Sequence, residues 1–207
     1  YFVSDRDGTM NIWAMKEDGT DKRQLTKHSG WDVRGPEIDR GRIVYQLGAD
    51  LWLLDAKTGV HRRITHDLWD EKEPTWTPAG DAITFASDRG APVVLHPVKK
   101  PGGFGAYGIY QVRVADDSLA LVIDTAGDDH SPAWSPDGTK LAFISDRGGA
   151  PDLWLLRLGG GAMKPLLRNQ NPEARIEGPA WSPACDRLAY AADFRPGGEA
   201  QGGNLDV

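Results

Sequence analysis

Cysteine is nearly absent from this sequence, and long apolar runs are missing altogether. The 207 residues include a single cysteine, Cys185. One thiol excludes an internal disulfide and any zinc site built on cysteine ligands. The apolar runs are short, as at 153–156, and fall well below the ~20 residues that a membrane-spanning helix needs. We therefore expect no membrane insertion.

Helical periodicity and the common catalytic motifs are also lacking. No segment repeats apolar residues at the helical period over three turns, so no substantial helix is predicted. The chain contains neither Gly-x-Ser-x-Gly nor His-Glu-x-x-His, and the glycines at 159–161 open no phosphate-binding helix. The histidines lack the close spacing of zinc ligands. We therefore predict that this chain is not itself an enzyme and has no metal centre.

Basic side chains are outnumbered by acidic ones. There are 24 Lys and Arg against 30 Asp and Glu, a net charge of −6. This balance argues against nucleic acid or an anionic membrane as the main partner. The apolar share of 40% and the charged share of 26% are ordinary for a globular protein, so a hydrophobic core can form.

What the sequence does contain is a repeat. The segment at 132–156, PAWSPDGTKLAFISDRGGAPDLWLL, recurs in part at 74–90 and 179–193 and more weakly at 36–55, and residues 1–15 match its second half. Its central aromatic recurs as Phe2, Tyr45, Phe85, Phe143 and Tyr190, and the next aromatic as Trp13, Trp52, Tyr110 and Trp154. Spacings between 40 and 58 residues fit propeller blades better than a helical solenoid.

Each repeat is interpreted as four short strands, a to d. Strand a holds Pro-x-Trp, strand b the aromatic run before Ser-Asp-Arg, strand c a Leu-Trp-Leu-Leu run and strand d an Arg-Gln-Leu-Thr run. Ser135-Pro136-Asp137-Gly138 predicts a tight turn between strands a and b. We predict an all-β chain, a β-propeller of four-stranded blades, in which the first unit lacks strand a and the last lacks strand d. The approximate units are 1–31, 32–69, 70–127, 128–174 and 175–207.

These motifs resemble the TolB-like propeller repeat, in which Pro-x-Trp-Ser-Pro-Asp-Gly leads into a strand ending in Ser-Asp-Arg. Residues 132–147 match it almost without gaps, whereas 4–11 and 41–53 are closer to the propeller of tricorn-type proteases. The resemblance implies the fold strongly and the function weakly, because the same repeat also serves in peptidases. TolB implies an exported or periplasmic setting and tricorn a cytosolic one, so the compartment stays open and the resemblance favours the former over the latter.

The sequence departs from that family in its extent. The separate N-terminal domain of TolB and the hydrolase domain of the peptidases are absent here, and fewer blades are visible than is usual. Tyr1 also opens in the middle of a strand pattern. We expect a fragment of a larger or recombined protein. The alternative is a homo-oligomer in which two chains complete one another through open sheet edges.

Residues that recur in every unit are interpreted as structural, because a repeat places them identically with or without a ligand. Asp5-Arg6, Asp88-Arg89 and Asp146-Arg147 are expected to cap turns and form ion pairs in the b–c hairpins. Trp76, Trp134 and Trp181 are expected to fill the space between neighbouring sheets.

The connections from strand d to the next strand a are the main candidates for binding, since they are expected to line one end of the propeller channel. Aligned on the strand-a proline, they supply Asp32, Asp70, Glu71, Asp128, Asp129 and His130, with His66 nearby. Such a collar would suit a basic peptide. The alternative is a solvated ring of side chains that cap strand ends. We expect no cofactor, a Ca²⁺ ion on these carboxylates being the alternative.

An insertion at 90–108 is the second candidate, because the other units lack it. It is basic and glycine-rich, and its recognition candidates are His96, Lys99, Lys100 and Phe104. Unrepeated loops on a rigid scaffold are natural recognition elements. The alternative is a loop that the surface merely tolerates.

Three hypotheses for function follow. The first is a non-catalytic propeller scaffold that binds a protein or peptide at its channel face. The second, implied by the resemblance, is a substrate-gating propeller of a tricorn-like or prolyl-peptidase-like serine protease whose catalytic domain lies outside this chain. The third is a structural or engineered propeller fragment without a ligand.

Overall fold

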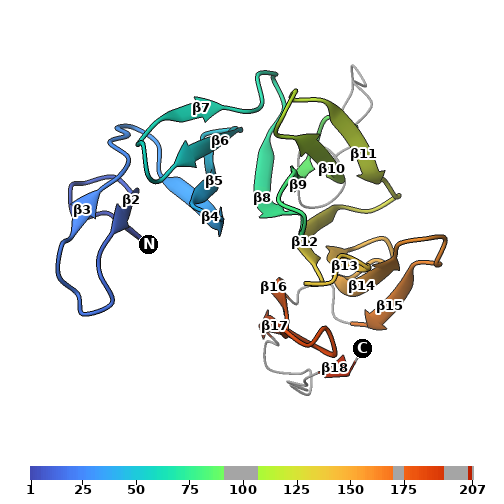
Figure 1. Cartoon of the computed structure of the whole chain (residues 1–207). Helices are drawn as coiled ribbons and strands as arrows, with labels where there is room; N and C mark the ends of the chain where they lie inside the picture. The colour runs from blue at the N-terminus through green and yellow to red at the C-terminus, as the bar shows by residue number, and fades with distance from the viewer. Residues whose placement is uncertain (91–106, 170–174, 194–204, 207) are drawn as a thin grey trace. The chain divides into compact units, whose positions relative to one another are not determined.

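The computed structural model describes residues 1–90, 107–169, 175–193 and 205–206. Every regular element in these ranges is a β-strand, and the strands form five antiparallel sheets in chain order (Figure 1). The first and last sheets have three strands and the others four. The predicted all-β chain of four-stranded blades, incomplete in its first and last units, is confirmed.

The chain divides into two compact units, Tyr1–Pro74 and Thr75–Val207, with the boundary inside β8. The first sheet holds β1 (Phe2–Ser4), β2 (Asn11–Ala14) and β3 (Arg23–Gln24). The second holds β4 (Val33–Asp39), β5 (Arg42–Leu47), β6 (Asp50–Asp55) and β7 (His61–Arg63).

The remaining three sheets follow the same order. The third holds β8 (Glu71–Trp76), β9 (Ala82–Ser87), β10 (Gly108–Arg113) and β11 (Leu119–Ile123). The fourth holds β12 (Asp129–Trp134), β13 (Lys140–Ser145), β14 (Asp152–Arg157) and β15 (Lys164–Leu167). The fifth holds β16 (Arg175–Trp181), β17 (Arg187–Asp193) and β18 (Leu205–Asp206).

The repeated aromatics are cross-strand neighbours in strands b and c. Because opposite residues of an antiparallel pair touch on one face, each pair forms a single aromatic contact. The pairs are Phe2 with Trp13, Tyr45 with Trp52, Phe85 with Tyr110 and Phe143 with Trp154. The sequence repeat is therefore a repeat of cross-strand aromatic pairs.

Hydrophobic cores lie between successive sheets within each unit. In unit 1, Ile12 of the first sheet packs against Val33, Ile43 and Tyr45 of the second. In unit 2, one core joins the third and fourth sheets through Ile109, Ile123, Leu141 and Phe143. Another joins the fourth and fifth sheets through Ala142, Ile144, Leu153, Ile176 and Leu188. Neighbouring sheets thus pack face to face, as propeller blades do.

The strand-a tryptophans contribute to this packing. The indole N–H of Trp134 donates to Thr84 Oγ1 in the preceding sheet at 2.9 Å. That of Trp181 donates to the Ala133 carbonyl at 3.0 Å. Trp134 and Trp181 therefore each add a directional bond to the apolar contact between sheets, as expected from their amphipathic rings.

Three of the four strands a show a bulge just before the proline. The preceding residue has positive φ in all four cases: Gly35 (51°), Glu73 (55°), Ser131 (50°) and Gly178 (60°). The ladder shifts register at this point in β4, β12 and β16. A bulge bends the strand and places proline where no ladder bond is required.

The predicted a–b turn also forms. The Gly138 N–H donates to the Ser135 carbonyl at 2.8 Å, and Gly138 has φ of 70°. Asp137 accepts from the Ser135 hydroxyl and from the backbone and side chain of Thr139. These hydrogen bonds favour the carboxylate and lower the pKa of Asp137 to about 2.

The arginine of the Ser-Asp-Arg motif lies over the cross-strand aromatic pair, an arrangement we call the arginine clamp. The Arg147 guanidinium is 4.1 Å from the Trp154 ring centroid and 5.3 Å from that of Phe143. Its Nε donates to Ser145 Oγ at 2.9 Å, and its Nη2 pairs with Asp129 at 3.2 Å. The ion pair therefore reaches strand a of the same sheet, whereas the motif aspartate Asp146 caps the Asp128 amide at 2.7 Å.

The same clamp occurs in two other sheets. Arg6 lies over Phe2 and Trp13, at 5.3 and 4.6 Å, and Arg89 lies over Phe85 and Tyr110, at 5.5 and 5.2 Å. Both arginines also donate Nε to a strand-b serine, Ser4 or Ser87. A guanidinium stacks on aromatic faces while its planar N–H groups bond in plane, which an ammonium cannot do.

We predict that Arg147→Ala lowers the free energy of unfolding in urea by about 3–5 kcal/mol, because it leaves the fully buried Asp129 carboxylate without its cation. The matched control is Arg113→Ala, whose pair with Asp116 is exposed and should change stability by less than about 1 kcal/mol. The double variant Arg147→Met with Asp129→Asn should recover part of the loss. An equal loss of unfolding free energy in Arg147→Ala and Arg113→Ala would contradict a stabilising role for the clamp.

Candidate functional site

The b–c turns and the d–a connections meet at the same end of the sheet in the first three sheets. In unit 1, the Met10 amide just before strand c donates to Asp32 Oδ1 at 2.9 Å, and the Glu71 amide donates to the Ala49 carbonyl at 3.0 Å. In unit 2, the Tyr107 amide donates to Asp128 Oδ1 at 3.0 Å. We call this end the connection end, and it carries all the described acidic candidates.

Two of those candidates are buried. Glu71 and Asp129 occupy equivalent positions at the start of strand a, and both have 0% exposure. Asp129 accepts hydrogen bonds from the backbone and hydroxyl of Thr125, at 2.9 and 3.0 Å, in addition to the Arg147 ion pair. Asp129 is thus held inside its sheet by these partners, and the burial of both carboxylates keeps them from a ligand at the surface.

The other candidates lie nearer the surface. Asp32 and His66 are exposed, and Asp70, Asp128 and His130 are half-buried. Asp32 and Asp128 also cap the amides described above, so each already holds its connection against a strand c. The His130 Nδ1 lies 3.0 Å from Ser131 Oγ. The alternative interpretation of the collar was that its side chains cap strand ends. Asp32 and Asp128 do so.

The candidates of the insertion, His96, Lys99, Lys100 and Phe104, lie outside the described residues. Within the described ranges, no group of three or more His, Cys, Asp or Glu side chains is arranged to hold a metal ion. The same part of the chain contains no helix with the length and hydrophobicity of a membrane span.

Exposed apolar side chains on the connections of unit 1 were missed by the sequence reasoning. Trp31, in the β3–β4 connection, is 68% exposed, and Leu68, in the β7–β8 connection, is 100% exposed. A signal was available, because Trp31-Asp32 and Trp69-Asp70 stand at the same distance before the strand-a prolines Pro36 and Pro74. The repeated aspartates were predicted as binding candidates, whereas the tryptophans beside them were not.

The b–c turn that packs against the connection determines the space at this point before the second and fourth sheets. The corresponding residue before the fourth sheet is Gly127, where a Cβ would clash with the backbone of Arg147. The second sheet has only the short Gly48–Ala49 turn there, and the Trp31 ring lies 3.9 Å from where a Gly48 Cβ would be. A short turn thus leaves room for a large side chain on the connection.

A second cluster in unit 1 surrounds His28. Its Nε2 lies 3.0 Å from the hydroxyl of the fully buried Tyr45, and its ring stacks on that of His61 at 5.5 Å. Burial, and secondarily the neighbouring His61, lower the pKa of His28. Burial also raises the pKa of Tyr45, so its hydroxyl stays protonated.

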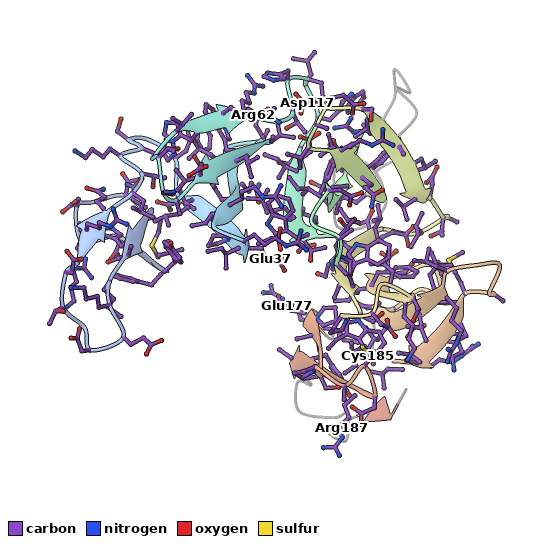
Figure 2. All side chains as sticks on the ribbon, in the orientation of Figure 1. Glu37, Arg62, Asp117, Glu177, Cys185 and Arg187 are labelled. Atoms are coloured by element: carbon purple, nitrogen blue, oxygen red, sulfur yellow. The ribbon has the colours of Figure 1, made fainter. Side chains whose placement is uncertain are left out.

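A third feature is a shallow cavity of about 300 Å³ on the fifth sheet, lined by Arg175, Glu177, Ala191 and Ala192. Figure 2 shows Glu177 projecting from this sheet. Among the described residues that line it, Glu177 is the only acid and none carries a hydroxyl or thiol nucleophile. The described residues therefore assemble no recognisable nucleophile and base at this point.

The sequence was compared with protein-family models and with curated proteins. No family model matches the chain. It is 27% identical over 209 residues to an uncharacterized protein of Agrobacterium fabrum, covering 94% of this chain and 66% of that protein. It is 25% identical over 205 residues to a tricorn protease homolog of Streptomyces coelicolor, covering 92% and 16%. It is 30% identical over 171 residues to a TolB homolog of Chlorobium luteolum, covering 77% and 34%.

Solved structures give the same result. TolB from Acinetobacter baumannii matches with a TM-score of 0.69 at 21% identity, over 92% of this chain and 44% of that one. An oligogalacturonate lyase from Vibrio parahaemolyticus matches with a TM-score of 0.68 at 18% identity, over 95% and 56%. Such likeness shows the fold alone, since these proteins differ in activity.

The chain spans between 16% and 66% of the length of the three curated relatives described. Its resemblance to them extends over most of its own sequence, and its sheets superimpose on a solved TolB propeller. The predicted resemblance is confirmed: the chain is a run of β-propeller blades similar in sequence and fold to TolB and similar in sequence to tricorn protease homologs.

Proposed function

We propose that this chain is a non-catalytic scaffold that binds a protein or peptide partner at the connection end of unit 1. The observation that carries the proposal is the exposure of Trp31 and Leu68 on two consecutive d–a connections. Burial of a tryptophan ring contributes strongly to association, and tryptophan is enriched among residues that dominate binding energy. These two side chains are the apolar anchors of the proposed interface.

The charge around these anchors indicates the chemistry of the partner. Asp32 and Asp70 each directly follow a tryptophan, and the net charge of the chain is −6. An aromatic face beside a carboxylate suits an arginine or lysine side chain, which can stack on the ring and pair with the acid. The partner is therefore proposed to present a basic, extended segment.

The relatives support a partner of this kind in general terms. A protein of Anaeromyxobacter that is named as the TolB of the Tol-Pal system is 34% identical over 83 residues, covering 40% of this chain. Its name places it in a system of several proteins. The insertion at 90–108 stays a predicted second contact with the partner, because it is an unrepeated loop on a rigid scaffold.

A second candidate function rests on the similarity to the tricorn protease homolog. This chain corresponds to only 16% of that protein, so a propeller of this type can be one part of a larger protease. In that setting the connection end would filter peptide substrates, and catalysis would lie elsewhere. Both functions use the same surface to contact peptides.

The binding prediction compares an arginine-rich peptide with its counterpart carrying glutamate in place of each arginine. Isothermal titration calorimetry should show binding of the arginine-rich peptide and no binding of the glutamate peptide. Trp31→Ala and Leu68→Ala should each weaken binding by about tenfold or more, as expected of anchor residues. The matched control is Val60→Ala, an equally exposed apolar residue in the c–d turn at the opposite end of the second sheet. Equal weakening by Val60→Ala, or equal binding of both peptides, would refute this surface.

The catalytic prediction is that the chain alone does not cleave peptide substrates, because no nucleophile elbow or zinc-protease motif occurs in it. A fluorogenic peptidase assay checks this, with added protease as the positive control. Turnover that co-purifies with the chain and disappears on one point substitution would show that the scaffold interpretation is wrong.

A further inference from the structure

The second sheet has the aromatic pair of an arginine clamp but no arginine. When Tyr45 is aligned with Phe143, the residue in the place of Arg147 is Ala49. The space over the pair is instead occupied by His28, which comes from the preceding β3–β4 connection. Its ring centroid lies 5.7 Å from that of Tyr45 and 6.1 Å from that of Trp52. A titratable imidazole thus stands where the other clamps have a permanent cation.

His28 also joins the first sheet to the second. Its backbone N–H donates to Asn11 Oδ1 at 2.8 Å, and Asn11 Nδ2 donates to the His28 carbonyl at 3.1 Å. Asn11 lies on β2 and is 2% exposed. The side chain of His28 meets Tyr45 on β5, so one residue holds the β3–β4 connection between both sheets. We call this contact the His28 latch.

The direction of the hydrogen bond to Tyr45 depends on the charge of His28. The buried hydroxyl of Tyr45 keeps its proton, and a neutral imidazole offers a nitrogen lone pair that accepts it. Protonated His28 would instead donate an N–H to this hydroxyl oxygen, so the proton of the buried hydroxyl would lose its acceptor. Protonation therefore reverses the bond and leaves a buried donor without this partner.

The groups that face His28 reinforce this preference. His61 on β7 stacks on it with ring planes 20° apart, and Tyr45 on β5 is the other titratable neighbour. Trp52 on β6 and Asn11 on β2 carry no charge. Arg63, also on β7, is paired with Asp50. No carboxylate among the described contacts of His28 favours an imidazolium, and a charge on His61 opposes one.

We propose that the His28 latch opens in mildly acidic solution and loosens the packing of the first sheet against the second within unit 1. The arginine clamps of the first, third and fourth sheets hold a cation at all relevant pH values and do not respond. Among the clamp residues of the first four sheets, only His28 can change its charge in mildly acidic solution.

The sign of the effect follows from proton linkage. The pKa of His28 is lower in the folded chain than the ordinary 6.5. The open form therefore binds the proton more tightly than the folded form. The stability supplied by the latch is fully present above about pH 6.5 and falls as the pH drops through that value. It reaches its lower limit once the pH is below the folded pKa.

The test compares the full chain with His28→Gln, which keeps a side-chain acceptor but cannot titrate, between pH 7.5 and 5.5. The melting temperature of the wild type should fall by about 3 °C more than that of His28→Gln. His28→Arg restores the clamp residue of the other sheets and should also be insensitive to acid. The control is His66→Gln, an exposed histidine on the next connection, which should respond to acid as the wild type does.

A direct measurement keeps the proposal falsifiable if a variant fails to fold. Proton NMR titration of the wild-type histidines, assigned with the same variants, should give His28 a pKa below the ordinary 6.5. His61→Gln should raise the His28 value towards normal. A His28 pKa at or above the ordinary value, or equal acid sensitivity of the wild type and His28→Gln, would overturn the latch.

Discussion

A β-sheet that is apolar on both faces must be covered on both, and this requirement organises the whole chain. In β9 every residue is buried, and in β13 only Lys140 is not. Their neighbours cannot all come from one side, because successive side chains point to opposite faces of a strand. Consecutive residues such as Ala142 and Phe143 accordingly enter different cores. The core of Ala142 is shared with the fifth sheet and that of Phe143 with the third. Sheets stacked face to face satisfy this condition.

The cross-strand aromatic pair and its clamp link that packing to the turns. Arg147 contacts two rings, the Ser145 hydroxyl and the Asp129 carboxylate, so it connects strands a, b and c of one sheet. Arg147 thereby forms an ion pair with Asp129, which the sequence pattern predicts as a residue that binds a partner. In the second sheet the clamp is supplied by a different part of the chain, and a titratable residue replaces a permanent charge. Repetition of the scaffold therefore leaves room for local differences in chemistry.

Those differences concentrate at the connection end. Strands b and c are constrained on both faces, whereas the connections need only cap the strand ends and can vary elsewhere. Asp32 performs the capping, and the adjacent Trp31 is left exposed because the Gly48–Ala49 turn is short. At the fourth sheet the equivalent residue is Gly127, and a Cβ there would clash with the Arg147 backbone. The contact between turn and connection thus limits which side chain the connection can carry at these two sheets.

The fold and the cross-strand aromatic pairs were predictable from sequence, because period, turn residues and apolar runs are local properties that each unit repeats. The Ser135–Gly138 turn formed for the same reason. The strand-a bulges, the partner of Arg147 and the burial of Glu71 and Asp129 were not predictable, since each depends on which strands lie side by side. His28 is the clearest case: no spacing relates it to Tyr45 or Trp52. Sequence alone determined the architecture of the sheets, and only tertiary contact decided which polar groups they bury and which they present, because burial depends on neighbours distant in the chain.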